Sequence, residues 1–139
     1  VEVFVCNITD QSPPGMPPPV PRDGVDFILM VFVLSALAPS QHIPALMKLR
    51  RALKPGGMLC FRDYGLYDMS QMRSQNILSH RLCRREDGTL AYFFTPEYTS
   101  KIFESAGFKV IETSYCTVHL VNKKKQTDMY RIFVHGKFQ

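Results

Sequence analysis

Residues able to bind or activate a ligand gather after one short apolar segment of the chain. Arg62, Asp63 and Tyr64 directly follow Met58–Phe61, and Tyr67 comes shortly after them. In open α/β sheets, ligands lie outside the carboxyl ends of the parallel strands, so these residues would border a site if Met58–Phe61 is such a strand. In the alternative, Arg62 and Asp63 form a structural ion pair and the tyrosines fill the edge of the core.

A serine nucleophile is a second chemistry to consider. Ser35, Asp63 and His119 occur in the chain order of the α/β-hydrolase triad. The strained turn that carries such a serine needs small residues two positions on either side, whereas Val33 and Leu37 stand there. We therefore do not expect a serine hydrolase.

The cysteines and histidines are too dispersed for a metal site or a disulfide framework. Zinc ligands cluster at short spacing, and disulfide scaffolds are usually smaller and richer in cysteine. We expect no metal, and reduced thiols in a cytoplasmic protein, with the nucleus and the mitochondrion left open. The residues concerned are Cys6, Cys60, Cys83 and Cys116, with His42, His80, His119 and His135.

The composition is that of one globular domain. Of the 139 residues, 45% are hydrophobic and 21% are charged, which argues against disordered, collagen-like and coiled-coil chains. The formal net charge of +5 is compatible with a polyanionic partner. The longest apolar run, Phe27–Ala38, is interrupted by Ser35 and too short to cross a bilayer. No charged-then-apolar leader opens the chain, so we expect neither secretion nor a membrane partner.

The first third of the chain predicts two strands of a parallel sheet. Val1–Cys6 alternates like a strand, and a proline-rich loop separates it from Asp26–Leu34. The second segment is apolar on both faces, which is typical of the centre of a parallel sheet covered by helices. Because the chain opens inside a strand, we expect its N-terminal part to be missing.

A helix and a further strand complete one right-handed crossover unit. We expect the helix to be capped by Ser40, with Pro44 in its first turn, and to stop at Lys54–Gly57 before the strand Met58–Phe61. Leu66–Ala91 reads as an insertion over the sheet edge. The remaining expected elements are a short helix at Met69–Leu78, a helix capped by Thr95 that stops at Gly107, and a hairpin of Phe108–Val121 and Asp128–Phe138.

These elements predict an α/β fold with a three-layer, mostly parallel sheet that ends in an antiparallel hairpin. The count is five strands, whereas a doubly wound domain usually carries six or seven. The shortfall again indicates that N-terminal strands are missing, and that residues 1–139 are the C-terminal part of a single domain.

The order of elements and several short strings resemble the class I S-adenosylmethionine-dependent methyltransferases. Within that class, the strings resemble the methyltransferase-like enzymes that make 3-methylcytidine in tRNA. The resemblance spans nearly the whole chain, and the Arg-Asp-Tyr-Gly string is its most specific part. The strings are Phe32–Ala36, Leu53–Gly57, Phe61–Gly65 with Tyr67–Asp68, Asp87–Thr89, Tyr92–Thr95, Val121–Gln126 and Gly136–Phe138.

The resemblance implies S-adenosylmethionine as the cofactor and places its nucleoside near three residues. Asn7 matches the position where the family usually has an adenine-binding Asp; Ile8 lies beside it, and Val31 packs on the nucleoside. The family's glycine-rich loop is missing, because no glycines of this chain form a close Gly-x-Gly pattern. We therefore expect the 139 residues alone to bind S-adenosylmethionine poorly or not at all.

The resemblance also implies roles in methylating cytosine N3, which needs alignment and charge stabilisation more than acid–base catalysis. Asp63 would stabilise the cationic ring, Tyr64 or Tyr67 would stack on it, and Arg62 would hold a phosphate. Arg85, in a basic run with Arg81 and Arg84, and a second run, Lys123–Lys125, would contact tRNA or remain solvated.

Two features depart from the family pattern where the substrate would be gripped. Ser74–Gln75 stands where relatives usually carry Phe and Lys, and Leu82–Cys83 replaces an aromatic pair. The alternative reading is therefore a non-catalytic or degenerate methyltransferase-like module that binds a partner. A helper protein is compatible with either reading.

Overall fold

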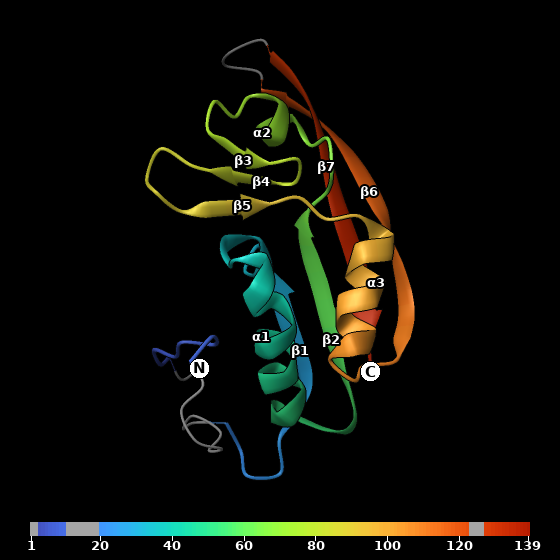
Figure 1. Ribbon diagram of the computed structural model, residues 1–139. Coiled ribbons are helices and arrows are strands. Elements are labelled where there is room, and N and C mark those ends of the chain that lie inside the picture. The colour runs from blue at the N-terminus through green and yellow to red at the C-terminus, as the bar shows by residue number, and fades with distance from the viewer. Residues whose placement is uncertain (1–2, 11–19, 123–126) are drawn as a thin grey trace.

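The computed structural model describes residues 3–10, 20–122 and 127–139, and it forms two layers with a small sheet at one end (Figure 1). The helices are η1 (Leu34–Ala36), α1 (Pro39–Ala52), α2 (Met69–Met72) and α3 (Pro96–Ser105). The strands are β1 (Val25–Val31), β2 (Leu53–Tyr64), β3 (Ile77–Ser79), β4 (Leu82–Arg84), β5 (Leu90–Tyr92), β6 (Val110–Asn122) and β7 (Thr127–Phe138).

The main sheet has the strand order β1-β2-β7-β6. β1 and β2 are parallel and joined through α1, which confirms the predicted crossover unit. β7 lies between β2 and β6 and is antiparallel to both, which confirms the C-terminal hairpin. The α/β class is thus confirmed, and among the described residues the sheet is mixed, with β1–β2 as its parallel pair.

One face of this sheet is covered and the other is open. α1 and α3 lie on the same face (Figure 1), where Leu59, Phe61 and Phe138 are buried. On the opposite face of β1, Phe27 and Leu29 are 67% and 77% exposed. We expected β1 to lie at the centre of a sheet, but here it is an edge strand, because the described residues supply neither a second neighbouring strand nor a helix on that face.

The prediction of a strand at Val1–Cys6 is wrong for the residues that the structure describes. Residues 3–6 form no strand, and Val3 and Val5 are almost fully exposed. A strand needs the backbone groups of a neighbour, and none of the described strands lies beside this segment.

The start of α1 also differs from the prediction. Ala38, not Ser40, is the N-cap, and Pro39 occupies the first helical turn, where its missing N–H costs nothing. The Gln41 side chain accepts a hydrogen bond from the Ala38 backbone N–H at 3.4 Å, so it satisfies the N–H of the N-cap residue itself. Pro44 therefore lies inside the helix.

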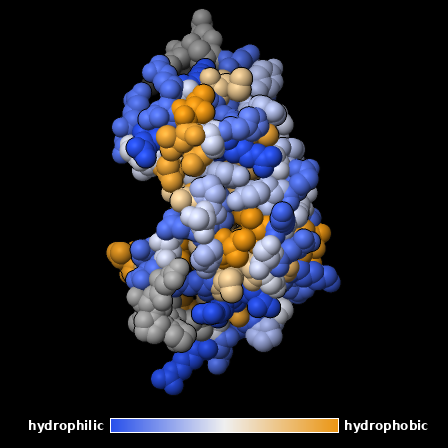
Figure 2. Space-filling view, in the orientation of Figure 1, coloured by the Kyte–Doolittle hydropathy of each residue, from blue (hydrophilic) through white to orange (hydrophobic). Residues whose placement is uncertain are grey.

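The segment between β2 and α3 is more ordered than the sequence indicated. α2 covers four residues, not the ten expected, and is followed by the antiparallel sheet β3-β4-β5. Figure 2 shows apolar side chains gathered on this part of the surface, where Met72, Ile77 and Leu78 are exposed. The predicted Thr95 cap is confirmed, since its hydroxyl accepts from the backbone N–H of Tyr98 at 3.2 Å.

His42 is the polar residue most deeply embedded in the aromatic core. Its side chain is fully buried between α1 and α3, and its Nε2 lies 3.3 Å from the carbonyl oxygen of Leu37. That contact requires Nε2 to donate, so Nδ1 accepts from the Tyr98 hydroxyl at 3.1 Å. The neutral ring thus satisfies both nitrogens, and burial lowers the pKa of His42 from 6.5 to about 4, although backbone hydrogen bonds partly offset it.

This pKa predicts a loss of stability in mild acid. Below pH 6.5 the unfolded chain takes up a proton at His42 that the folded chain refuses until about pH 4. The difference amounts to about 2 kcal/mol between pH 7.5 and pH 5. Urea unfolding at both pH values measures it, with His42→Gln as the variant that cannot titrate. An equal loss in wild type and variant would contradict the prediction.

Candidate functional site

Three aromatic rings meet at the carboxyl ends of β1 and β2, on the face away from α1 and α3. The ring of Phe32 lies 4.9 Å from that of Tyr64 and 5.5 Å from that of Phe133, between centroids. Phe32 follows β1 with a φ of 55°, which is uncommon for a residue with a side chain. Its N–H donates to the carbonyl of Arg62 at 2.9 Å, so the parallel pairing holds this residue in place.

Three arginines stack on these rings. The guanidinium carbon of Arg62 lies 4.4 Å from the centre of the Phe133 ring, and that of Arg85 lies 5.3 Å from the centre of the Tyr64 ring. Arg131 lies within 6 Å of both rings. Such contacts stabilise a cation over the π face and present a surface suited to a base and its phosphate. We call Phe32, Tyr64, Phe133, Arg62, Arg85 and Arg131 the aromatic–arginine cluster.

Asp63 lies behind this cluster, on the covered face of the sheet. Its side chain is fully buried, and its carboxylate accepts hydrogen bonds from the backbone N–H groups of Ser35 and Tyr64, both at 2.9 Å. Burial raises the pKa of Asp63, although the hydrogen bonds from Ser35 and Tyr64 oppose it. Successive residues of a strand face opposite sides, so the alternative of an Arg62–Asp63 ion pair is wrong.

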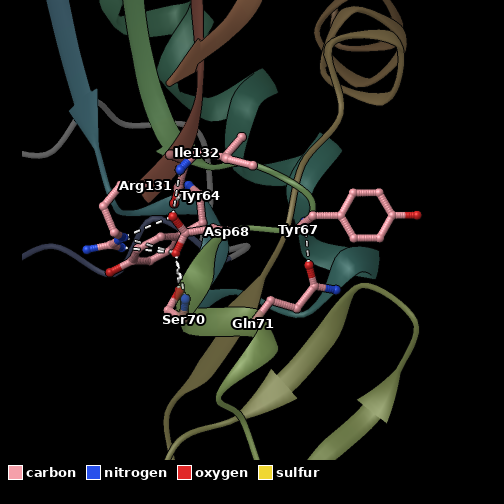
Figure 3. A network of polar contacts seen from close by, with 8 residues as sticks. Tyr64, Tyr67, Asp68, Ser70, Gln71, Arg131 and Ile132 are labelled. Atoms are coloured by element: carbon pink, nitrogen blue, oxygen red, sulfur yellow. Dashed lines mark hydrogen bonds and ion pairs between the residues drawn. The ribbon is translucent and has the colours of Figure 1, made fainter. Parts of the chain in front are cut away.

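Asp68 is a site residue that the sequence analysis missed (Figure 3). It is fully buried, and it accepts from Arg131 Nε at 2.9 Å, from the Ser70 hydroxyl at 2.6 Å and from the Ile132 backbone N–H at 2.7 Å. Burial by itself would raise the pKa of Asp68, but these hydrogen bonds outweigh it and lower the pKa. The Asp68-Met69-Ser70 string indicates that Asp68 caps a helix. Nothing in the sequence indicates that Asp68 also pairs with Arg131 on β7.

Tyr67 and Tyr64 do not lie together. Tyr67 is 60% exposed and, in Figure 3, points away from Asp68 and Arg131, on the side opposite Tyr64. Its φ is 66°, and its backbone N–H donates to the side chain of Gln71 at 2.7 Å. The aromatic–arginine cluster therefore includes Tyr64 and excludes Tyr67.

The residues expected to hold the nucleoside are distributed over two sides of the sheet. The Asn7 side chain accepts from Thr9, and its carbonyl accepts from Lys48 of α1 at 2.9 Å, so Asn7 lies next to α1. Ile8 packs against the core. Val31 is half exposed and pairs in register with Arg62, which places it on the open face near the cluster.

A polar cleft of about 780 Å³ opens beside the cluster, between α2, the β4–β5 turn and β7. It takes in two of the three arginines of the basic run, while Arg81 lies over the Tyr98 ring at 6.0 Å. Lys123–Lys125 lie outside the described residues. The lining residues are Met69, Ser70, Arg73, Ser74, Gln75, Asn76, Arg84, Arg85, Glu86, Asp87, Met129 and Arg131, and we call this the arginine-lined cleft.

Other chemistries find no support in the described part of the chain. No group of three or more His, Cys, Asp or Glu residues lies close enough there to hold a metal ion. His119 stacks on Tyr130 and lies 3.6 Å from Asp128 on the hairpin, so it does not join Ser35 and Asp63. None of the described helices has the length and apolar character needed to span a membrane.

Comparison with known proteins relates this chain to methyltransferases. A family model described as "Methyltransferase domain" matches residues 6–113. Over 97% of its length, the chain is 42% identical to the human tRNA N(3)-cytidine methyltransferase METTL2B. Over 99% of its length, it is 34% identical to the human tRNA N(3)-cytidine methyltransferase METTL6. It is also 43% identical, over 99% of its length, to "O-methyltransferase 3" of Dictyostelium discoideum. The chain spans only 32–48% of the length of these relatives.

Solved structures support the same fold at lower identity. A SAM-dependent methyltransferase from Methanosarcina mazei matches 98% of this chain with a TM-score of 0.66 and 17% identity, and the match covers 65% of that protein. The Burkholderia thailandensis 1,6-didemethyltoxoflavin-N1-methyltransferase, solved with S-adenosylhomocysteine, matches 95% of this chain and 48% of its own, with a TM-score of 0.58 and 16% identity. The expected Rossmann-like fold is thereby confirmed.

The Asp68 network predicts a marked loss of stability in Asp68→Asn. The amide replaces a buried carboxylate and leaves the half-buried Arg131 without its counter-ion, which lowers the free energy of unfolding by about 2 kcal/mol. Urea denaturation measures the change. The control is Asp26→Asn, which breaks an exposed ion pair with Lys54 and costs about 0.5 kcal/mol. Similar losses in both variants would show that the network stabilises nothing.

Proposed function

We propose that this chain, which belongs to the methyltransferase domain family, is part of an S-adenosylmethionine-dependent enzyme that methylates N3 of cytidine in tRNA. The names of relatives about 40% identical over nearly the whole chain support this substrate. The structural observation that carries the proposal is the aromatic–arginine cluster at the carboxyl ends of β1 and β2, where ligands of open α/β sheets lie.

In this proposal the chain's residues orient an unstacked cytosine. N3 keeps an in-plane lone pair at neutral pH, and the cofactor supplies the methyl group when bound, so positioning and exclusion of water are the protein's main tasks. Tyr64 and Phe32 offer ring faces on which the base stacks. Arg62 and Arg85 provide guanidinium groups for the neighbouring phosphate. Tyr67, exposed on the other side of α2, contacts an adjoining nucleotide.

Asp63 acts in this proposal as a positioning residue. It has no exposed surface from which to touch a substrate, but it fixes the backbone of Ser35, in the η1 turn that follows Phe32. This positioning role takes the place of the direct contact between Asp63 and the cationic cytosine ring that the resemblance implied. The electrostatic effect of a buried carboxylate near that ring would still favour its positive charge.

The residues expected at the nucleoside of S-adenosylmethionine are not all brought together. The half-exposed Val31 lies on the open face near the cluster, whereas Asn7 and Ile8 lie beside α1 and the core. We therefore keep Val31 as the candidate for a nucleoside contact on the open face. The glycines of the sequence are never spaced as Gly-x-Gly, so the glycine-rich loop that would hold the amino-acid part of the cofactor does not occur within these 139 residues. We therefore propose that residues 1–139 are the C-terminal part of a single methyltransferase domain.

The open face of the main sheet supports that domain assignment. Phe27, Leu29 and Val31 of β1 form an exposed apolar row, which water disfavours and which a neighbouring layer would bury. A further strand beside β1 would make it the interior strand that its sequence predicts.

Two other readings lead to distinct results in the same assays. The Dictyostelium relative's name favours transfer to an oxygen atom, and the absent glycine loop favours a module that binds without catalysis.

In our proposal tRNA is the partner, with or without a helper protein. All four cysteines are free, which accords with a reducing compartment such as the cytoplasm.

We expect Tyr64→Leu in the full-length protein to reduce kcat/KM for tRNA methylation about tenfold, because aromatic stacking contributes about 1–3 kcal/mol per base. Transfer of labelled methyl groups to tRNA measures the rate. The control is Tyr130→Leu, an exposed tyrosine that stacks on His119 and lies on the face of β7 opposite Arg131. Methylation of hydroxyl compounds and not of tRNA by the wild type would overturn the substrate, and no transfer at all would favour the binding module.

We expect Asp63→Ala to reduce turnover far more than it weakens S-adenosylmethionine binding. Removal of the carboxylate leaves the Ser35 N–H without its acceptor and so disorders the turn beside the base. Asp63→Asn should recover part of the turnover, because its amide oxygen can still accept from Ser35. Turnover and calorimetric cofactor affinity of the two full-length variants test this. Unchanged turnover in Asp63→Ala would remove Asp63 from the site.

A further inference from the structure

We propose that the arginine-lined cleft binds the phosphodiester backbone of the RNA whose base is methylated. The proposal rests on the RNA substrate inferred above and adds a second binding site for it. Four arginines reach the cleft from three segments: Arg73 after α2, Arg84 and Arg85 at the end of β4, and Arg131 on β7. Guanidinium groups are well matched to phosphate, since their fork of N–H donors pairs with two oxygens at once.

The four cleft arginines differ in their counter-ions, and Arg131 is already paired with Asp68 at 2.9 Å. Within the residues that the structure describes, no ion pair involves Arg73, Arg84 or Arg85. Of the two carboxylates that line the cleft, Asp87 already accepts from the backbone N–H and hydroxyl of Thr89, at 2.9 and 2.7 Å. The four arginines outnumber Glu86, Asp87 and the buried Asp68, so the cleft keeps a small positive excess available to an anion from outside the chain.

The cleft is continuous with the aromatic–arginine cluster. Arg85 and Arg131 belong to both, because they line the cleft and lie within 6 Å of the Tyr64 ring. A strand with its base on Tyr64 would therefore lead its phosphates into the cleft. The Asp68 network fixes Arg131 beside the start of α2, since both donate hydrogen bonds to the same carboxylate (Figure 3).

The polar side chains of the cleft fit an extended strand better than a small anion. Ser70, Gln75 and Asn76 add neutral donors and acceptors to the lining, and the volume of about 780 Å³ exceeds that of a single phosphate. Neutral groups of this kind contact sugars and phosphate oxygens along nucleic-acid backbones. Ser74–Gln75, the departure from the family pattern, thereby receives a place in the site.

The test compares two double variants of the full-length protein. Arg73→Gln/Arg84→Gln removes two exposed cations of the cleft and leaves the cluster intact. Arg22→Gln/Arg51→Gln removes two exposed cations near the opposite end of the sheet and is the matched control. Fluorescence anisotropy with a labelled single-stranded RNA measures affinity across salt concentrations, and methyl transfer to tRNA is followed in parallel.

We expect the cleft variant to bind RNA about tenfold more weakly at 0.1 M salt. The magnitude of the slope of log K against log salt should fall by about 1.4, because two phosphate contacts are lost. The control should retain the wild-type slope apart from a small general charge effect. Equal losses in both variants, or competition by free cytidine monophosphate as effective as that by RNA, would overturn the cleft as a backbone site.

The outcome is separable from that of the proposed function. Methylation of tRNA by the wild type, with an unchanged slope in the cleft variant, would reject the cleft and retain the enzyme. Cleft-dependent RNA binding without methyl transfer would retain the cleft and reject the enzyme. If the wild type binds no RNA, both proposals fail.

Discussion

The parallel pairing of β1 with β2 is the constraint on which the site depends. It can form only if the chain crosses back over the sheet through α1, and it brings the carboxyl ends of both strands to one edge. The hydrogen bond from Phe32 N–H to the carbonyl of Arg62 continues the pairing one step beyond β1. Phe32, which follows β1, is thereby held beside Tyr64, the last residue of β2, and both become part of one surface.

Two buried carboxylates fix the loops that leave this edge. Asp63 binds the backbone of the turn after β1, and Asp68 binds α2 and β7 through Ser70, Arg131 and the Ile132 N–H. Their pKa values shift in opposite directions, because Asp63 meets neutral donors in a buried setting whereas Asp68 meets a guanidinium. Both carboxylates are structural, while Arg62 and Arg85 form no ion pair among the described residues and can meet a ligand.

The two faces of the main sheet differ, because helices pack on one face and the other is exposed (Figure 1). Aromatic packing, with Phe103 and Phe138 stacked at 3.6 Å, joins α3 to β7 on the covered face. The other face combines the apolar row of β1 with the cationic cluster near the ends of the strands. A surface of that kind accommodates an apolar layer over the strands and an anionic, aromatic ligand at their ends.

The sequence by itself determined the elements whose signals are local. The Thr95 cap, the helix that follows it, the apolar β1 and the C-terminal hairpin were all predictable, because capping residues and hydrophobic periodicity act within a few positions. The Arg-Asp-Tyr-Gly string likewise indicated where a site would lie. Only the tertiary structure decided which of its side chains face that site, since strand alternation buries Asp63 and leaves Arg62 partly exposed on the other face.

Contacts between distant segments were decided only by the fold. Arg131 is 63 positions from Asp68, and nothing in either neighbourhood indicates the other. The same holds for Phe133 beneath Arg62, and for the division of the basic run between the arginine-lined cleft and the Tyr98 ring. Residues 3–6 show the converse, because a strand-like pattern forms no strand without a neighbour to accept its hydrogen bonds.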